Sequence, residues 1–266
     1  MGAASTYAGS FDTHTFWSLL DSTLFVRPAL IALAVALAAM VVGIVLGICG
    51  ALALGSRIKS LRPAVRGYVW LFRGTPALVQ IIFWYDGVSQ LSGGRINLSP
   101  LVAGIIALGV NEGAYMTEIV RSGLLAVDPG QREAAAALGL SSGKTLRFVV
   151  AHQALRILVP PVSNQFIVLL KNTSLLFVIS VPEIFGTGQI AFTENYRYLE
   201  VLAVVSLWYL ALTALATFVQ RRLERKFGDQ DGAPTDTPTT GPDAPKDSKL
   251  GWRRMRQEAL SVEGGI

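Results

Sequence analysis

Charged residues are scarce in this chain of 266 residues: Asp, Glu, Lys and Arg together make up 15% of it. A soluble domain carries about 25% charged residues. The hydrophobic share is 52%, and the apolar residues stand in long blocks instead of alternating with polar ones. This distribution predicts an all-α, polytopic bundle of membrane-spanning helices in a lipid bilayer, and it excludes an ordinary soluble domain.

Cysteine and histidine are nearly absent too. Cys49 is the single cysteine, so no disulfide can form within the chain. His14 and His152 are far apart, and neither has the Cys or His neighbours of a zinc site. A membrane-embedded enzyme needs a paired nucleophile and base, or a metal cluster. We therefore predict no catalytic residue, no metal site and no cofactor.

Five apolar stretches approach the length of about 20 residues that a spanning helix needs. The predicted spans are Pro28–Leu54, Tyr68–Val88, Leu98–Val120, a stretch from Ile157 or Pro160 to Val181, and Leu199–Val219. The second is interrupted by Arg73-Gly74-Thr75-Pro76. In the first, Gly43 and Gly47 form a small-xxx-small pair, which allows another helix to approach closely.

Basic residues predict the orientation of these spans. Fourteen Lys and Arg follow the first, third and fifth spans, and three lie on the opposite side. Loops rich in Lys and Arg face the cytoplasm. The N-terminus is therefore expected outside and the C-terminus in the cytoplasm. The same loops account for the net charge of +5, so no nucleic-acid partner is expected.

Two terminal segments fall outside the predicted membrane domain of residues 25–227. Residues 1–24 are expected to form an extracytoplasmic or interfacial segment. It includes a short helix within residues 10–24, because Phe11, Phe16, Trp17 and Leu20 are loosely spaced for one face. Residues 228–266 are rich in Pro, Thr, Gly and Asp, which predicts a disordered cytoplasmic tail.

The cytoplasmic segment 126–156 has its own helix signals. Asp128 and Pro129 are a suitable N-cap and first helical residue. Ala134 to Ala137 are strong helix formers, and Gly139 is placed to end the helix as a C-cap. Ser141 or Ser142 can then cap a second helix near Lys144. The predicted helix, turn and helix would offer a surface of small residues for a close protein contact; an ordinary connection between spans is the alternative.

The stretch from Gly139 to Thr145 superficially resembles a phosphate-binding loop. That motif requires four residues between its glycines, but three separate Gly139 from Gly143, and Leu138 stands at the required glycine position. Nucleotide hydrolysis is therefore not expected in this chain.

Several motifs resemble those of a known family. Glu133-Ala134-Ala135, followed after three residues by Gly139, is similar to the EAA loop of ABC importer permeases. Other blocks, in the same order, resemble the polar amino acid branch of that family: Arg73–Pro76, Glu112–Tyr115 with Glu118 and Arg121, Gln153-Ala154, Pro160-Pro161 and Lys171–Leu175. The resemblance extends from about Arg27 to Gly228.

This resemblance implies a function and a set of partners. The chain would be a permease subunit in a bacterial inner membrane, importing a polar amino acid or a related solute such as an opine. A coupling helix carrying Glu133, Ala134, Ala135, Leu138 and Gly139 would dock on a cytoplasmic ATPase dimer. An extracytoplasmic solute-binding protein would deliver the substrate. A second permease subunit, identical or related, is expected because five spans cannot readily enclose a path.

One departure from the family pattern concerns the end of the loop. The family usually has Leu-Pro there, and this chain has Ala151-His152. Proline would force a helix break, which His152 does not. Pro160-Pro161 is expected to supply the break instead.

Ionisable residues inside the predicted spans cost about 2.5–3.5 kcal/mol each on insertion scales, so Glu112, Glu118 and Lys171 require an explanation. Mutual pairing or a position near a span end would explain them without a function. We predict instead that Glu118, Lys171, Asn172, Thr173 and Ser174 line a substrate path. A passive channel would also have buried polar groups, but it needs no exposed cytoplasmic helix-turn-helix.

Overall fold

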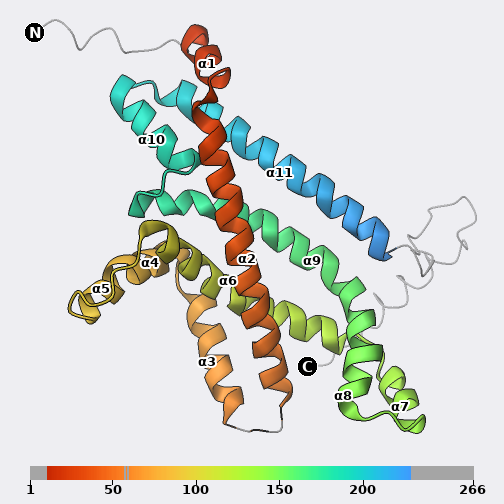
Figure 1. Cartoon of the computed structure of the whole chain (residues 1–266). Helices are drawn as coiled ribbons and strands as arrows, with labels where there is room; N and C mark the ends of the chain where they lie inside the picture. Colours follow the sequence, from red (N-terminus) through yellow and green to blue (C-terminus); the bar gives the residue numbers. More distant parts are fainter. Residues whose placement is uncertain (1–10, 57, 59, 229–266) are drawn as a thin grey trace, which may run out of the picture. The chain divides into compact units, whose positions relative to one another are not determined.

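The computed structural model describes residues 11–56, 58 and 60–228. The regular elements of this part of the chain are helices (Figure 1). The α-helices are α1 (Thr13–Leu20), α2 (Val26–Gly55), α3 (Leu61–Gly74), α4 (Ala77–Ile82), α5 (Val88–Leu91), α6 (Pro100–Leu125), α7 (Pro129–Ala137), α8 (Ser142–Lys144), α9 (Ala151–Asn172), α10 (Ile184–Asn195) and α11 (Tyr198–Gly228). Four irregular helical segments complete them: 3₁₀ turns at Thr23–Phe25 and Thr173–Ile179, and π-helical turns at Phe83–Gly87 and Thr145–Val150. The all-α prediction is confirmed.

Within the described residues, three helical stretches are long and apolar enough to cross a membrane: Thr23–Gly55, Ser142–Ile179 and Tyr198–Phe227. The first, third and fifth predicted spans correspond to α2, α6 and α11. The count of five spans and the orientation stay predictions. Most of the predicted tail lies outside the described residues.

The second predicted span is two helices rather than one. α3 ends at Gly74, Thr75 is extended with φ −114° and ψ 147°, and α4 begins after Pro76. α3 also begins seven residues before the predicted start, at Leu61. The polar interruption in the sequence therefore marks a true break in the helix.

Glycines bring α2 and α6 into close contact. A Cβ on Gly43 would lie 2.7 Å from Cγ of Glu112, and Gly47 and Gly50 face Met116 and Thr117 in the same way. A methyl group at these positions would overlap α6. The predicted close approach at Gly43 and Gly47 is confirmed, and its partner is α6.

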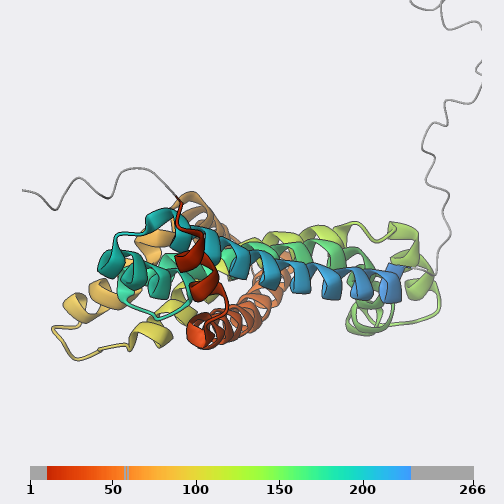
Figure 2. The same cartoon turned by 90° about the horizontal axis from the view of Figure 1, so that it is seen from above.

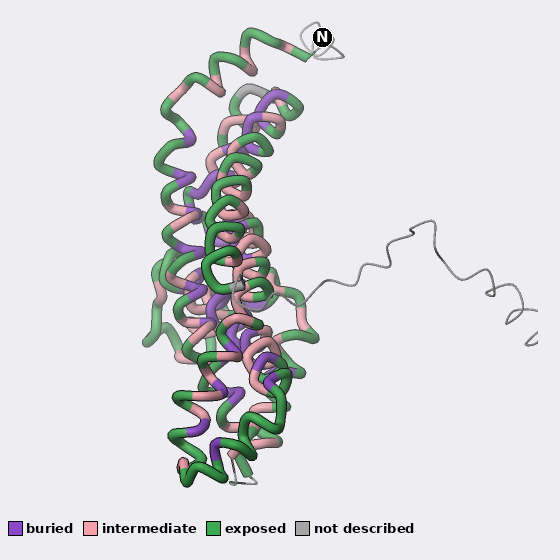
Figure 3. The backbone as a smooth tube through the Cα atoms, turned by 90° about the vertical axis from the view of Figure 1, so that its right-hand side faces the viewer, coloured by how far each residue is buried: buried purple, intermediate pink, exposed green. Residues whose placement is uncertain are grey.

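Two clusters of buried apolar residues hold the helices together. The first joins α2, α4, α6, α9 and the segment Thr173–Ile179: Val35, Ala39, Met40, Ile81, Ala103, Ala107, Leu108, Met116, Leu169, Leu176 and Ile179, with Val181 directly after them. The second joins the turn Thr23–Phe25, α2, α10 and α11 through Phe25, Ala29, Ala32, Ile184, Val201, Val204 and Val205. Figure 3 shows buried and exposed positions interleaved along the long helices, because each of these helices covers the core with one side.

The predicted break at Pro160-Pro161 is wrong. α9 continues through both prolines, from Ala151 to Asn172, and both are exposed. Proline is tolerated within membrane helices where local adjustments satisfy the carbonyls that it leaves unpaired. The irregularity lies earlier, at the π-helical turn Thr145–Val150, directly before Ala151-His152. The helix therefore begins before the predicted Ile157 or Pro160.

α10 is absent from the sequence prediction. Glu183 caps its N-terminus: its carboxylate accepts hydrogen bonds from the backbone N–H groups of Phe185 at 2.9 Å and Gly186 at 2.6 Å. The Tyr209 hydroxyl of α11 also donates to this carboxylate. Glu183 is fully buried, so its cap ties α10 to α11.

The N-terminal helix predicted within residues 10–24 is present as α1. Phe16 and Leu20 pack on the second cluster, but Phe11 and Trp17 are exposed, so the four aromatic and apolar residues do not share one buried face. Figure 2 shows α1 beside the first turns of α11. Its placement at a membrane interface stays a prediction.

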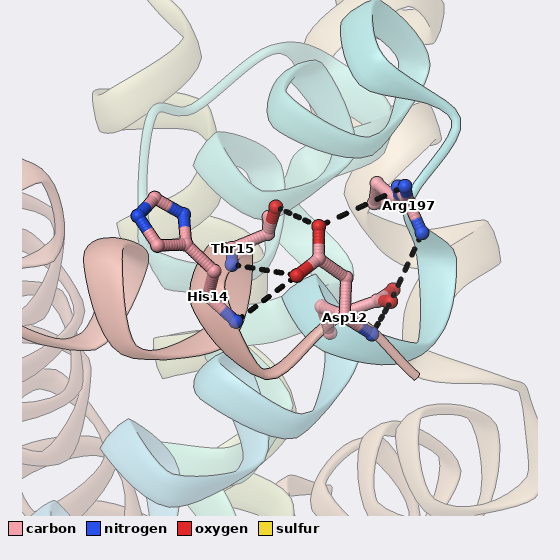
Figure 4. A network of polar contacts seen from close by, with 5 residues as sticks. Asp12, His14, Thr15 and Arg197 are labelled. Atoms are coloured by element: carbon pink, nitrogen blue, oxygen red, sulfur yellow. Dashed lines mark hydrogen bonds and ion pairs between the residues drawn. The ribbon is translucent and has the colours of Figure 1, made fainter. Parts of the chain in front are cut away.

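A polar network fastens α1 to α11 (Figure 4). Asp12 caps α1 by accepting hydrogen bonds from the backbone N–H groups of His14 and Thr15 and from the Thr15 hydroxyl. The Asp12 backbone N–H donates to Glu200 at 2.7 Å. The Arg197 guanidinium lies 3.7 Å from the Asp12 carboxylate and 3.6 Å from that of Glu200.

Candidate coupling surface and transport path

The predicted cytoplasmic helix is α7, and its start follows the sequence signals. The Asp128 carboxylate accepts a hydrogen bond from the Gly130 N–H at 2.6 Å, and Pro129 is the first helical residue. Ala135 is the buried residue of α7 and is 3% exposed. Glu133 and Ala134 are exposed, so this part of the short helix is open to a partner.

A glycine turn ends α7 as predicted. Gly139 has φ +75°, a left-handed conformation that glycine adopts without steric cost. The Leu140 N–H donates to the Ala135 carbonyl at 3.0 Å, and the Gly139 N–H donates to the Ala136 carbonyl at 2.9 Å. These two bonds form a Schellman motif. Leu138, at the tip, is 82% exposed.

Side chains connect α7 firmly to α6 and α9. The Arg132 guanidinium donates to the Leu124 carbonyl at 2.7 Å, and the Gln153 amide donates to the Gln131 side-chain oxygen at 3.0 Å. Val127, Val150 and Ala154 form a small buried cluster beside them. Figure 1 shows α7 and α8 at the end opposite α1 and α10. The loop is thus joined to two long helices, α6 and α9.

The hydroxyls of the predicted path residues bond to their own helix. Thr173 is fully buried, and its hydroxyl donates to the Leu170 carbonyl at 2.8 Å. The Ser174 hydroxyl donates to the Lys171 carbonyl at the same distance. Lys171 is exposed, whereas Asn172 is half-buried.

Glu118 does not lie beside residues 171–174. α6 and α9 run in opposite directions, since Gly123 faces Leu158 and Gly104 faces Leu176. In that register the position opposite Glu118 is about eight residues from Lys171, or roughly 12 Å along the helix. Within one chain, the two groups therefore lie at different levels and do not form one compact site.

Residues 39–229 match the family described as "Binding-protein-dependent transport system inner membrane component". The chain belongs to this family.

Related proteins are permeases of amino acid transport systems. The "Glutamine transport system permease protein GlnP" of Escherichia coli (strain K12) is 34% identical over 219 residues, 82% of this chain and 98% of that protein. The "Arginine transport system permease protein ArgU" of Corynebacterium glutamicum is 36% identical over 236 residues, 82% of this chain and 72% of that protein. The chain is thus the permease subunit of an amino acid ABC importer, an inner-membrane component and not itself an enzyme.

Solved structures agree with this assignment. A structure described as "Crystal structure of an amino acid ABC transporter with histidines" has a TM-score of 0.74 and 32% identity, covering 82% of this permease and 100% of that chain. The MetNI methionine ABC transporter has a TM-score of 0.65 at 22% identity, covering 82% of this permease and 99% of that chain, and shares the fold.

Glu112 is a buried polar residue that the predicted path omits. It is 2% exposed, in the middle of α6, where Gly43 of α2 packs on its side chain. The Gln165 amide of α9 donates to its Oε2 at 3.3 Å, and Oε1 accepts no hydrogen bond from the described residues. The sequence signal was a carboxylate within an apolar span; only the structure shows that three helices of the permease meet there.

Proposed function

We propose that this permease imports a polar amino acid into the cytoplasm, powered by a separate ATPase dimer that docks on α7 and its glycine turn. The observation that carries the proposal is the coupling turn itself. Leu138 projects from it, Ala134 leaves room for close approach, and Arg132 and Gln131 link the helix to α6 and α9. A surface of this kind serves both to bind a partner and to transmit its movement.

The cargo follows from the relatives. Permeases named for glutamine and arginine transport are 34% and 36% identical to this chain over the aligned residues. Both amino acids have a polar side chain, an ammonium and a carboxylate. A solute-binding protein would present the amino acid at the outer face, and a second permease subunit would complete the path. Glu118 and the stretch Lys171–Ser174 are proposed to line that path.

Uptake by the reconstituted complex tests the proposal. The permease, its ATPase and its binding protein are placed in liposomes, and ATP-dependent uptake of labelled glutamine and arginine is measured in competition with the other common amino acids and an opine. We expect saturable uptake of a polar amino acid that disappears with an ATPase unable to hydrolyse ATP. Uptake by the permease alone, or competition by the opine only, would contradict the proposed mechanism or cargo, respectively.

A further inference from the structure

The break between α3 and α4 leaves a carbonyl without its usual partner. In an α-helix the Phe72 carbonyl would accept a hydrogen bond from the backbone N–H of residue 76. Residue 76 is proline, which has no N–H. Within a membrane, an unpaired carbonyl is costly because no water replaces the lost donor. The break therefore needs donors from elsewhere.

Two buried amides supply these donors. The Asn111 amide of α6 donates to the Phe72 carbonyl at 2.9 Å, and the Gln80 amide of α4 donates to the same oxygen at 3.0 Å. Asn111 also donates to the Gln80 side-chain oxygen at 3.0 Å, and Gln80 donates to the Thr75 hydroxyl at 2.8 Å and carbonyl at 3.2 Å. Asn111 is 9% exposed and Gln80 is 7% exposed. We call these two side chains the carbonyl clamp.

The carbonyl clamp lies at the start of α4, and α4 packs against the segment Thr173–Ile179, which follows α9. Ile81 of α4 is fully buried in the cluster that contains Leu176 and Ile179. These two residues belong to the 3₁₀ segment that begins with Thr173 and Ser174, two of the proposed path residues. The direction of the chain after the break thus affects how α4 packs against the segment Thr173–Ile179.

We propose that Asn111 and Gln80 are positioning residues for transport: they hold the bend at Pro76 and so place α4 against the path segment Thr173–Ile179. They act through this packing and do not contact the substrate. The inference rests on the proposed amino-acid import, which it extends by assigning a role to two residues outside the proposed path.

Kinetics separate positioning from simple support of the fold. Asn111→Leu keeps the size of the side chain and removes its hydrogen bonds. The matched control is Asn97→Leu, which also removes two hydrogen bonds, one from the Ser89 hydroxyl and one to the Gly94 carbonyl, in the exposed connection before α6. We expect about a tenfold rise in KM for uptake with Asn111→Leu, the effect of losing about 1.4 kcal/mol of hydrogen bonding. Asn97→Leu should leave KM unchanged at equal protein level.

A double-variant cycle identifies the carbonyl as the link. Pro76→Ala supplies the backbone N–H that the Phe72 carbonyl accepts when α3 continues through Thr75 and residue 76 into α4. In the closed helix the carbonyl no longer needs the Asn111 donor, so the cycle is read in a Pro76→Ala protein whose α3 and α4 are shown by spin-label distances to have joined. Asn111→Leu should therefore raise KM in the native background and add less than about twofold in the Pro76→Ala background. Equal effects of Asn111→Leu in both backgrounds would overturn the inference.

A distance measurement makes the test independent of the cargo. Spin labels at Leu78 of α4 and Val178 of the path segment, both partly exposed, are placed in a Cys49→Ser protein. Asn111→Leu should shift or broaden the measured distance distribution, and Asn97→Leu should not. An unchanged distribution would overturn the positioning role, whereas a changed distribution in a protein that transports no amino acid would refute only the proposed function.

Discussion

Replacing Gly139 by valine should uncouple the permease without unfolding it. No atom lies within 4 Å of the position that a Cβ would take, so the added side chain meets open space. The cost is conformational: a residue with a Cβ pays roughly 1–2 kcal/mol in the left-handed region that φ +75° requires. A penalty of that size lowers the ratio of formed to unformed turn by a factor of about 5–30. It is small beside the roughly 5–15 kcal/mol that stabilise a folded domain, so the membrane bundle should persist.

The assay is substrate-stimulated ATP hydrolysis by the reconstituted complex, with the inserted permease quantified in parallel. Asparagine tolerates the left-handed conformation, so Gly139→Asn should retain most of the stimulation and Gly139→Val the least. Gly143→Ala is the matched control, since Gly143 lies in α8, has open space around it and has no positive φ. Full stimulation with Gly139→Val, or equal loss with Gly139→Asn, would refute the assignment of this turn as the coupling element.

Three further predictions concern packing, pH and the path. Gly47→Ala should lower the midpoint temperature of unfolding of the purified permease, because its methyl group overlaps α6. Gly67→Ala, which meets open space, should not lower it. Equal midpoints for the two variants would show that α2 and α6 are not so tightly packed. The Thr15 hydroxyl donates a hydrogen bond to the Asp12 carboxylate and holds the pKa of Asp12 below its ordinary 3.8. The stabilising effect of this network is therefore present above pH 3.8 and is lost as the pH falls through the lowered pKa. Spin-label distances from α1 to α11 should therefore change only in strong acid, and Asp12→Asn should remove that change; release of α1 at neutral pH would contradict it. Glu118→Gln and Ser174→Ala should each alter the KM or Vmax of uptake at unchanged basal ATPase activity, and unchanged kinetics in both would remove these residues from the path.

Local signals in the sequence determined much of what the structure shows. Asp128-Pro129 and Gly139 predicted the start and end of α7, because N-caps, first-turn prolines and left-handed glycines act through the backbone of their immediate neighbours. Gly43 and Gly47 predicted a close helix contact, since a residue without a side chain lets another backbone approach. Long apolar stretches predicted α2 and α11, because the thickness of the bilayer requires them.

Other features were decided by tertiary contacts. Pro160-Pro161 was expected to break a helix, but α9 continues through it, whereas the helix does break at Pro76. The difference cannot be read from proline itself: at Pro76 the freed Phe72 carbonyl is taken up by Asn111, which is 39 residues away in the sequence. The partner of Gly43, the burial of Glu112 among three helices and the separation of Glu118 from Lys171 likewise depend on the register between helices. The sequence specifies each helix by local chemistry, whereas which carbonyls, glycines and carboxylates meet depends on contacts that form only when distant segments pack together.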